Sequence, residues 1–356
     1  MRSRVIPFPP ALTLFLAVMA CGGDVRPRRT SLTLGAPALS VGVLQGAREE
    51  MFGEIGDVVA SPNGEFFVLD AQTQEINRYD SSGILRERVG RPGSGPGEFR
   101  AAADLAVTPD GYLVVVDEAT RELSVYRVRP DRLEYAHKHQ LPFLPRQVCQ
   151  AAGRLFVLGL HNSFALHEVT LAGRVRNSFA SVPGVVDPAI VGPDQELLRE
   201  MYAVGQLACL GGRSPMVAYV PETFPVIRAF SADGRALWQA EIDQYHEFRR
   251  SQDAQGLVRF RPDPEIMRTH HATGLSAIDE SAFVLQLTER DYEREEVVGL
   301  RSRLVSAANG QTISMADNLP RLSEAAGGRV YAWRSDPYPQ VLVFALPPIS
   351  DQPAAQ

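Results

Sequence analysis

The chain repeats one pattern of apolar and polar positions twice near its N-terminus. In residues 55–83, and again in residues 105–128, a short apolar run precedes a Pro-Asn-Gly or Pro-Asp-Gly turn, a β-branched and aromatic run, and a second apolar segment. Proline presets φ and glycine accepts the positive φ of a tight hairpin, so each turn joins two antiparallel strands. The turn glycines Gly64 and Gly111 lie 47 positions apart, from 64 to 111. A period of about 40 to 50 residues with several short strands per unit is typical of a β-propeller.

Each second strand of the pair ends at an aspartate. Asp70 and Asp117 both stand six residues after their turn glycines, so they coincide when the units are aligned. A carboxylate at this point can accept backbone N–H bonds from the next turn. We therefore interpret both aspartates as structural residues rather than catalytic ones.

The doubled unit resembles the NHL repeat and the wider group of bacterial six-bladed propeller proteins. The residues that carry this resemblance are the glycine-rich linker from Gly90 to Phe99, the Pro-Asp-Gly turn that ends at Gly111, and the Val-Val-Val-Asp run that ends at Asp117. They cover about a fifth of the chain, and the later units match less well. The resemblance implies a ring of six small sheets.

Counting turn positions gives the same number of units. Four more turns, each followed by an apolar strand, are centred on Gly153, Gly212, Glu280 and Gly328. We expect one all-β domain over residues 31–346, a six-bladed β-propeller, with helix only at 195–203 and 264–268 and a disordered tail at 347–356. Apolar segments at 31–34 and 39–43 precede the first unit, so an N-terminal strand is expected to complete the last blade. Ring closure of this kind removes an exposed sheet edge.

The first residues indicate export and a lipid anchor. Residues 1–20 carry Arg2 and Arg4 and then an apolar stretch too short to span a bilayer, as in a signal peptide. The sequence Val-Met-Ala-Cys looks like a lipoprotein cleavage site, which would leave Cys21 lipidated ahead of a linker over residues 21–30. We expect a protein of the cell envelope, anchored to the outer membrane facing the periplasm or at the cell surface. Its formal charge of −6 argues against a nucleic-acid partner.

Two long gaps between units, at residues 176–204 and 239–271, are insertions on one face of the predicted ring. The second is rich in cationic side chains that could hold a carboxylate, phosphate or sugar acid. Its candidate ligand-binding residues are Arg249, Arg250, Arg259, Arg268, His270 and His271. The same stretch contains six acidic residues, so a self-paired, solvated loop is the alternative, and Thr288–Glu296 is expected to form a charged turn beside it. The predicted role is a scaffold that binds a small anionic ligand or a protein, without a cofactor.

A metal-dependent hydrolase or lyase is the alternative function. His161, His270 and His271 are predicted to reach one mouth of the ring, as in six-bladed amidating lyases that bind zinc through histidines, but no compact ligand motif supports such a site. A lactonase would need carboxylates around an axial ion, and the sequence does not place them. Cys149 and Cys209 fall in the first strands of adjacent units, where either a disulfide or two buried thiols is compatible with the pattern.

Overall fold

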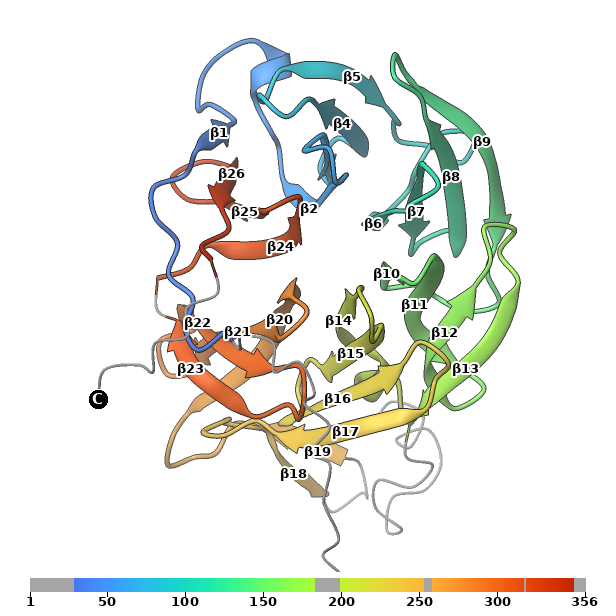
Figure 1. Ribbon diagram of the computed structural model, residues 1–356. Coiled ribbons are helices and arrows are strands. Elements are labelled where there is room, and N and C mark those ends of the chain that lie inside the picture. Colours follow the sequence, from blue (N-terminus) through green and yellow to red (C-terminus); the bar gives the residue numbers. More distant parts are fainter. Residues whose placement is uncertain (1–28, 183–198, 253–257, 317, 349–356) are drawn as a thin grey trace, which may run out of the picture.

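The computed structural model of the chain describes residues 29–182, 199–252, 258–316 and 318–348. In these residues the strands form six four-stranded antiparallel sheets arranged around a central axis, as Figure 1 shows. The all-β, six-bladed prediction is therefore confirmed. The predicted signal peptide and Cys21 lie outside the described residues, as do residues 349–356 of the predicted tail. No described helix is long and apolar enough to cross a membrane.

Each blade runs outward from an innermost strand at the axis. The strands of blades 1 to 3 are β2 (Ile55–Ala60), β3 (Phe66–Asp70), β4 (Glu75–Tyr79), β5 (Leu85–Val89); β6 (Ala102–Val107), β7 (Tyr112–Asp117), β8 (Glu122–Val128), β9 (Leu133–Gln140); and β10 (Gln147–Ala151), β11 (Arg154–His161), β12 (Phe164–Val169), β13 (Val175–Ser181). Those of blades 4 to 6 are β14 (Gly205–Leu210), β15 (Met216–Pro221), β16 (Val226–Ser231), β17 (Ala236–Glu241); β20 (Arg268–Asp279), β21 (Ala282–Asp291), β22 (Glu296–Ser306), β23 (Thr312–Ala316); and β24 (Arg321–Ala326), β25 (Arg329–Arg334), β26 (Gln340–Ala345).

The N-terminal strand closes the ring, as predicted. Strand β1 (Leu39–Val41) pairs antiparallel with β26 and becomes the outer strand of blade 6. The 3-10 helix η1 (Arg48–Glu50) then leads into blade 1. The other segment expected to be a strand, residues 31–34, is not one, because Leu32 inserts its side chain into the core between blades 5 and 6 instead of pairing along an edge.

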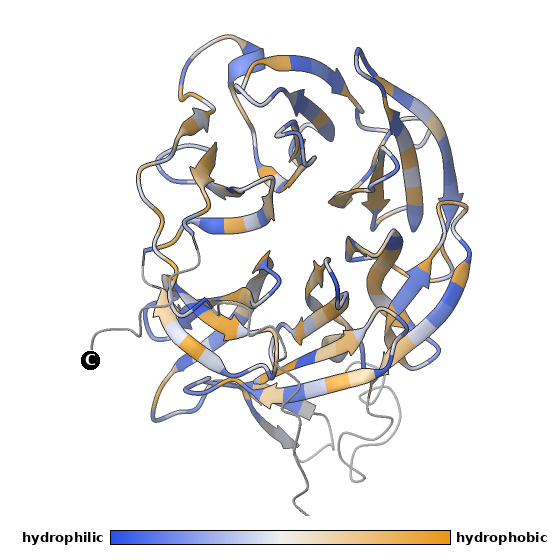
Figure 2. Ribbon diagram, viewed as in Figure 1, coloured by the Kyte–Doolittle hydropathy of each residue, from blue (hydrophilic) through white to orange (hydrophobic). Residues whose placement is uncertain are grey.

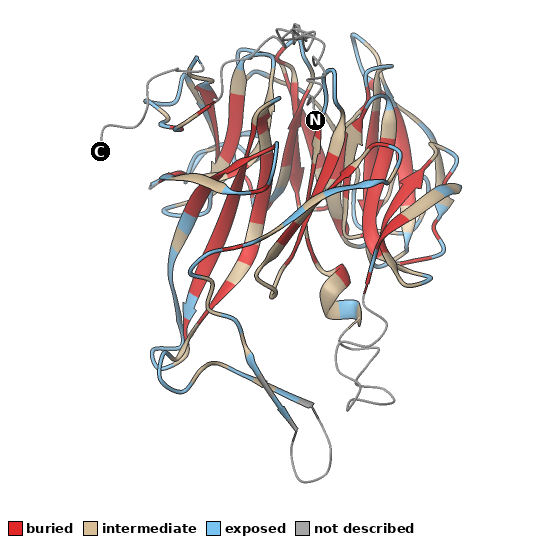
Figure 3. Ribbon diagram, turned by 60° about the horizontal axis from the view of Figure 1, so that its bottom comes forward, coloured by how far each residue is buried: buried red, intermediate tan, exposed pale blue. Residues whose placement is uncertain are grey.

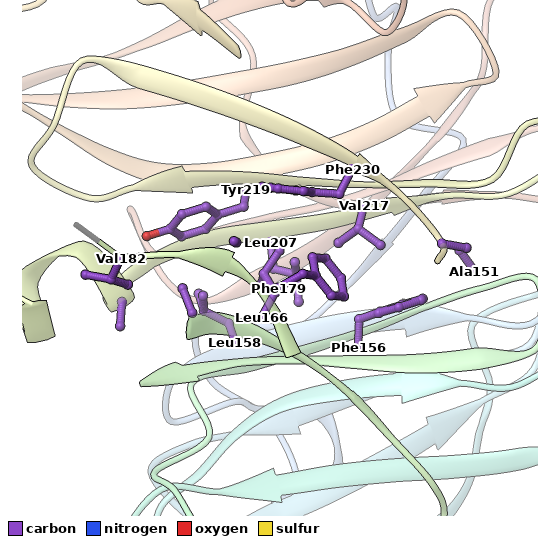
Figure 4. Packing of buried hydrophobic residues seen from close by; sticks show 14 residues of the cluster. Ala151, Phe156, Leu158, Leu166, Phe179, Val182, Leu207, Val217, Tyr219 and Phe230 are labelled. Carbon is purple, nitrogen blue, oxygen red and sulfur yellow. The ribbon is translucent and has the colours of Figure 1, made fainter. Parts of the chain in front are cut away.

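The hydrophobic core lies between the blades. Six clusters of buried apolar side chains fill the six junctions between neighbouring blades, including the junction between blades 6 and 1. Figure 4 shows one of them, where Phe156 and Leu166 of blade 3 face Val217 and Tyr219 of blade 4. Each fully buried large side chain contributes about 1.5–3 kcal/mol by leaving water. Closure therefore adds a sixth core to the five that an open arc would have.

The local sequence explains why the strands form and where they turn. Strand β3 (Phe-Phe-Val-Leu-Asp) is buried along its whole length, as expected of a strand covered by blades on both faces. Gly64 and Gly111 have φ of +86° and +82°, so both occupy the left-handed region for which glycine is suited. Outer strands carry more hydrophilic residues, as β9 shows in Figure 2, because one of their edges meets water.

Asp70 and Asp117 have the structural role predicted for them. Asp70 accepts backbone N–H bonds from Gly53, Glu54, Gln72 and Thr73. Asp117 does the same for Arg100, Ala101 and Thr120. Each carboxylate thus ties the turn that follows its strand to the segment that enters the blade.

The two insertions have narrower limits than the sequence indicated. The first begins after Ser181, since residues 176–181 complete the outer strand β13, and the second runs from residue 242 to 267. Residues 199–203 are helical, which confirms the described part of one predicted helix, whereas residues 264–266 form only a turn. The second insertion contains a two-stranded hairpin, β18 (Arg249–Gln252) and β19 (Val258–Arg261). Figure 3 shows this hairpin and the short helix projecting from the same face of the ring.

Blade 5 is longer than expected on that face. Strand β20 begins at Arg268, so His270 and His271 lie within a strand and not in the loop before it. Strand β21 continues to Asp291 and β22 begins at Glu296, so the predicted charged turn over Thr288–Glu296 is mostly strand. Pairing with the extended β20 explains this difference, because it supplies backbone partners for residues that have no strand-like apolar pattern of their own.

Candidate functional site

A cavity of about 430 Å³ lies on the axis of the ring. Its walls come from the innermost strands of all six blades. Glu118 and Glu222, which follow the second strands of blades 2 and 4, also line it. In each blade the turn after the second strand lies on the same face as the connection to the next blade. The cavity therefore extends toward the face that carries the insertions. Its volume is within the usual range of small-molecule sites.

The cavity is encircled by six positions, one near the start or middle of each innermost strand, and five of them carry polar side chains. We call this set the axial ring; in blade order it consists of Asp57, Asp104, Gln147, Gln206, Gly274 and Glu324. Register shifts typical of β-bulges occur at four of these positions, next to Asp57, Asp104, Gly274 and Glu324. Bulges re-aim side chains beside functional sites, which suits their position here.

Members of the axial ring connect each blade to the next. Asp57 accepts a hydrogen bond from the backbone N–H of Leu105 at 3.1 Å, and Asp104 accepts one from Val148 at 2.7 Å. Gln147 accepts the N–H of Leu207 at 2.6 Å, and Glu324 accepts that of Ala60 at 2.7 Å. Blade 5 makes the corresponding bond to blade 6 from its second strand, where Gln286 accepts the N–H of Leu322 at 2.7 Å. One side-chain oxygen in each of these pairs is therefore committed to the fold.

The three carboxylates of the ring come from adjacent blades and perturb one another. Burial raises the pKa of Asp57 to about 6, although hydrogen bonds, including one with Asp104, act in the opposite direction. Burial and the charge of Asp57 raise the pKa of Asp104 well above its ordinary value. Burial and, to a smaller extent, the charge of Asp57 raise the pKa of Glu324 to about 8. At neutral pH Glu324 therefore largely keeps a proton that an isolated carboxyl group would have lost, and the pKa of Asp104 is shifted in the same direction.

The two arginines that line the cavity differ in their ion pairs. Arg146 pairs with Glu118 at 2.9 Å. Arg321, in β24, has no acidic partner among the residues that the structure describes, and makes only long hydrogen bonds of 3.5 Å to the Thr273 carbonyl and the Thr288 hydroxyl. Its guanidinium lies over the Trp333 ring at 5.4 Å. Burial lowers its pKa, but an arginine remains protonated at physiological pH.

Cys149 and Cys209 form a disulfide that joins the neighbouring blades 3 and 4 beside the axis. Their Cα atoms are 5.6 Å apart, on the innermost strands β10 and β14. Both residues also line the cavity. The structure thus decides between the disulfide and the two thiols that the sequence left open.

The predicted cationic residues do not gather into one site. Arg249 pairs with Asp263, and Arg268 pairs with Glu289 and Asp291, each at 3.2 Å. Arg259 lies in β19 and has an interaction of its own, while the side chain of Arg250 is outside the described part of the chain. His271 contacts Glu222 at the cavity wall, 3.2 Å away. The paired arrangement matches the self-paired alternative, and a ligand role for these residues stays a prediction.

His270 lies in a different cluster from the one predicted. It stacks on His246, with ring centroids 4.8 Å apart, and its Nε2 lies 4.0 Å from the Glu289 carboxylate. His161 is in blade 3 and contacts Phe143 and His167. One potential ligand atom from each of His246, His270 and Glu289 lies within 4.8 Å of the others, a spacing compatible with a metal ion.

The hydrogen bonds of this cluster do not suit a metal ion. The backbone N–H of His246 donates to His270 Nδ1 at 2.9 Å, so neutral His270 carries its proton on Nε2, the atom that faces Glu289. A metal-binding histidine instead donates from its second ring nitrogen. Glu289 is already paired with Arg268 and with Arg301, the latter at 2.6 Å. Burial and the neighbouring His246 lower the pKa of His270 to about 4, which keeps it neutral. The metal-dependent alternative stays a prediction, without support from this geometry.

The aligned units contained a signal for part of the axial ring. Asp57 and Asp104 each stand seven residues before their turn glycines, Gly64 and Gly111, and so coincide as closely as Asp70 and Asp117 do. Neither aspartate was predicted to line a site, because an aspartate near an apolar run resembles an ordinary polar strand boundary. Glu324, Gln147 and Gln206 belong to units without a clear alignment and carried no such signal.

Comparison with known proteins agrees with this geometry. Residues 43–162 match a family model described as a 6-bladed beta-propeller. Together with the six closed blades, this match identifies the fold. The chain is a six-bladed β-propeller. No curated relative matches its sequence. Membership of the NHL group specifically stays a prediction.

Solved structures with the same fold are distant in sequence. The propeller resembles a member of the DUF4221 family from Bacteroides vulgatus, with 8% identity, a TM-score of 0.55, and coverage of 90% of this chain and 99% of that one. It also resembles a protein from Bacteroides fragilis described as exported, with 11% identity, a TM-score of 0.53, and coverage of 92% and 98%. Virginiamycin B lyase from Staphylococcus aureus matches at 9% identity and a TM-score of 0.49, over 87% and 99% of the chains. These likenesses concern the fold alone.

Proposed function

We propose that this propeller is an extracytoplasmic binding protein that holds a small polar ligand in its axial cavity. The observation that carries the proposal is the combination of Arg321, which lacks an acidic partner among the described residues, with an axial ring of carboxylates and amides around one cavity. Uncompensated polar groups on a rigid scaffold are what a specific small-molecule site needs. The ring strands are held by inter-blade hydrogen bonds, so the site is preorganised.

The extracytoplasmic location has support from two separate features. Disulfides persist in oxidising compartments, and Cys149 is paired with Cys209. The N-terminal sequence has the pattern of a lipoprotein signal with Cys21 as the lipidated residue. We propose a lipid-anchored protein of the cell envelope, at the outer membrane facing the periplasm or at the cell surface.

The position of Arg29 gives the anchored propeller an orientation. Arg29 is buried and donates to Asp279 at 2.6 Å, in the turn between the first and second strands of blade 5. This turn lies on the face opposite to the insertions. Cys21 precedes Arg29 by only eight positions, so a lipid on Cys21 would hold that opposite face toward the membrane. The cavity mouth would then point away from the bilayer.

A cavity-filling variant tests the proposal. We suggest a thermal-shift screen of the dialysed protein against amino acids, short peptides, sugar acids and polyamines, repeated with Ala103→Phe, which fills the cavity wall in β6. Ala236→Phe, at an exposed position of the outer strand β17, is the matched control. A ligand should raise Tm in the wild type and in the control but not in Ala103→Phe. Stabilisation that is equal in both variants, or no stabilising compound at all, would count against the axial cavity as a binding site.

A protein partner is the second occupant that a scaffold of this kind can have. The β18–β19 hairpin projects beside the cavity mouth and would be its contact surface. Replacing residues 250–260 with a short glycine linker leaves the six blades intact. If partner capture from envelope extracts survives this change, the hairpin is not the contact surface.

A further inference from the structure

The cavity presents carboxyl acceptors from the axial ring and, nearer its mouth, the cation of Arg321. Asp57, Asp104 and Glu324 each use one oxygen for a backbone N–H of the neighbouring blade. Each is only partly buried and lines the cavity, so a ligand can reach all three carboxyl groups, although Asp57 also makes side-chain hydrogen bonds with Asp104 and Ser323. Three carboxylates within interacting distance, without a basic partner among the described residues, favour a ligand group that is positively charged and donates hydrogen bonds.

Arg321 favours a ligand group of the opposite charge, an anion. Its guanidinium is fixed over Trp333, and its planar array of donors matches a carboxylate in a bidentate manner. The cation is partly desolvated and makes only 3.5 Å hydrogen bonds, so an anion placed there would gain more than it would at a fully hydrated arginine.

The two kinds of group lie on one strand at a defined separation. Arg321 and Glu324 are three residues apart on β24, and both line the cavity. The bulge between Leu322 and Glu324 offsets the alternation that would otherwise send them to opposite sides of the strand. At a rise of about 3.3 Å per residue, their Cα atoms are separated by about 10 Å along the strand. Arg321 stands at the start of β24, nearer the mouth, and Glu324 lies deeper.

We infer that the ligand is a short peptide-like zwitterion, with its carboxylate at Arg321 and its ammonium group at Asp57, Asp104 and Glu324. An extended tripeptide spans about 10 Å at 3.3–3.6 Å per residue, which matches the separation along β24. On the far side of the ring Gln147 donates to Gln206 Oε1 at 3.2 Å, which leaves the Gln206 amide N–H to meet a peptide carbonyl. This assignment rests on the proposed function, because it names the ligand class of the same cavity.

The protonation of the ring agrees with this assignment. Burial raises the pKa of Asp57, and burial together with repulsion by the charge of Asp57 raises the pKa values of Asp104 and Glu324. An ammonium group would relieve that repulsion and displace the retained protons.

Three capped forms of one peptide test the inference by calorimetry. The probes are triglycine, triglycinamide, which lacks the carboxylate, and N-acetyl-triglycine, which lacks the ammonium group. We expect triglycine to bind at least tenfold more tightly than either capped form. Arg321→Gln should lower triglycine affinity to the level of triglycinamide and leave triglycinamide binding unchanged. Glu324→Gln, which keeps an acceptor for the Ala60 N–H, should reduce the advantage of triglycine over the N-acetyl form. Arg132→Gln, an exposed cation in the turn of blade 2, is the matched control and should change nothing.

The outcomes separate this inference from the function on which it depends. Equal affinity for triglycine and triglycinamide would show that Arg321 holds no carboxylate, and equal affinity for triglycine and the N-acetyl form would show that the ring holds no ammonium group. Either result, or no binding of triglycine at millimolar concentration, overturns the zwitterion assignment. If another compound still stabilises the wild type but not Ala103→Phe, the proposed function stands without it. If no compound does so, both fail.

Discussion

The carboxylate of Asp57 in blade 1 accepts the backbone N–H of Leu105 in blade 2 at 3.1 Å. Asp104, its counterpart one repeat later, makes the same kind of bond to Val148 in blade 3. The acidic groups that line the cavity thus also hold neighbouring blades together through hydrogen bonds. Binding and stability are coupled in this propeller, and substitutions in the ring have to be designed to separate them.

Asparagine and alanine at position 57 should differ in stability. Asn retains an oxygen that accepts the Leu105 N–H, whereas Ala leaves this buried donor unpaired, which costs about 1–3 kcal/mol. We expect Asp57→Ala to be less stable than Asp57→Asn by that amount in denaturant unfolding at pH 8. Equal stability of the two variants would mean that the inter-blade bond contributes nothing measurable.

The stability that Asp57 and Glu324 contribute should fall as pH rises from about 4 to about 8, whereas His270, whose pKa is lowered to about 4, acts in the opposite direction below about pH 6.5. The pKa of Glu324 is raised to about 8, and that of Asp57 to about 6, chiefly by burial, so both groups hold protons more tightly in the folded state. A raised carboxyl pKa contributes stability that is complete below the unfolded pKa and is lost as pH rises through the folded value. The groups that face them are Asp104, Ser323 and the Ala60 and Leu105 backbones.

The variant Glu324→Gln isolates the larger of these effects. It cannot ionise, so its unfolding free energy should depend less on pH between 5 and 9 than that of the wild type, and it should be the more stable protein at pH 9. Unfolding curves at several pH values check this. Parallel pH profiles for the two proteins would contradict the assignment.

Loss of the disulfide should destabilise the propeller. A bridge that spans 60 positions constrains the unfolded chain by about 4 kcal/mol in the loop-entropy treatment. We expect Cys149→Ser with Cys209→Ser to lose stability of this order under non-reducing conditions, and the wild type in reductant to behave similarly. Thiol titration of the denatured, unreduced wild type checks the bridge itself. Two free thiols besides Cys21 would exclude it.

Zinc should not stabilise the protein through His270. The backbone N–H of His246 donates to His270 Nδ1, which places the proton of neutral His270 on Nε2. The Glu289 carboxylate already forms an ion pair with Arg301. Added Zn²⁺ is therefore expected to leave Tm unchanged. A rise in Tm that disappears in His270→Ala and persists in the neighbouring control His271→Ala would revive the metal-dependent alternative.

Much of the fold could be predicted because its signals are local. The Pro-Asn-Gly and Pro-Asp-Gly turns and the buried runs beside them mark strands within a few residues. The predicted strand boundaries were wrong where contacts with distant segments of the chain determine them. Leu32 fills a core between blades 5 and 6, and β20 continues back to Arg268 because β21 pairs with it.

The site was mostly beyond prediction for the same reason. His270 and His271 are adjacent in sequence, yet one stacks on His246 and the other meets Glu222, because neighbours on a strand point to opposite sides. Of the axial ring, only Asp57 and Asp104 shared a recognisable repeat position.

The sequence by itself determined the repeating unit, the number of blades and the strand that closes them, since hydrophobic period and turn chemistry act over a few residues. The tertiary structure alone decided that Asp57, Asp104 and Glu324 meet on one axis, that Cys149 joins Cys209, and that Arg321 has no acidic partner in the part of the chain that the structure describes. These relationships join residues far apart in the chain. Ring closure brings them together, and no local pattern encodes which side chains will then face one another.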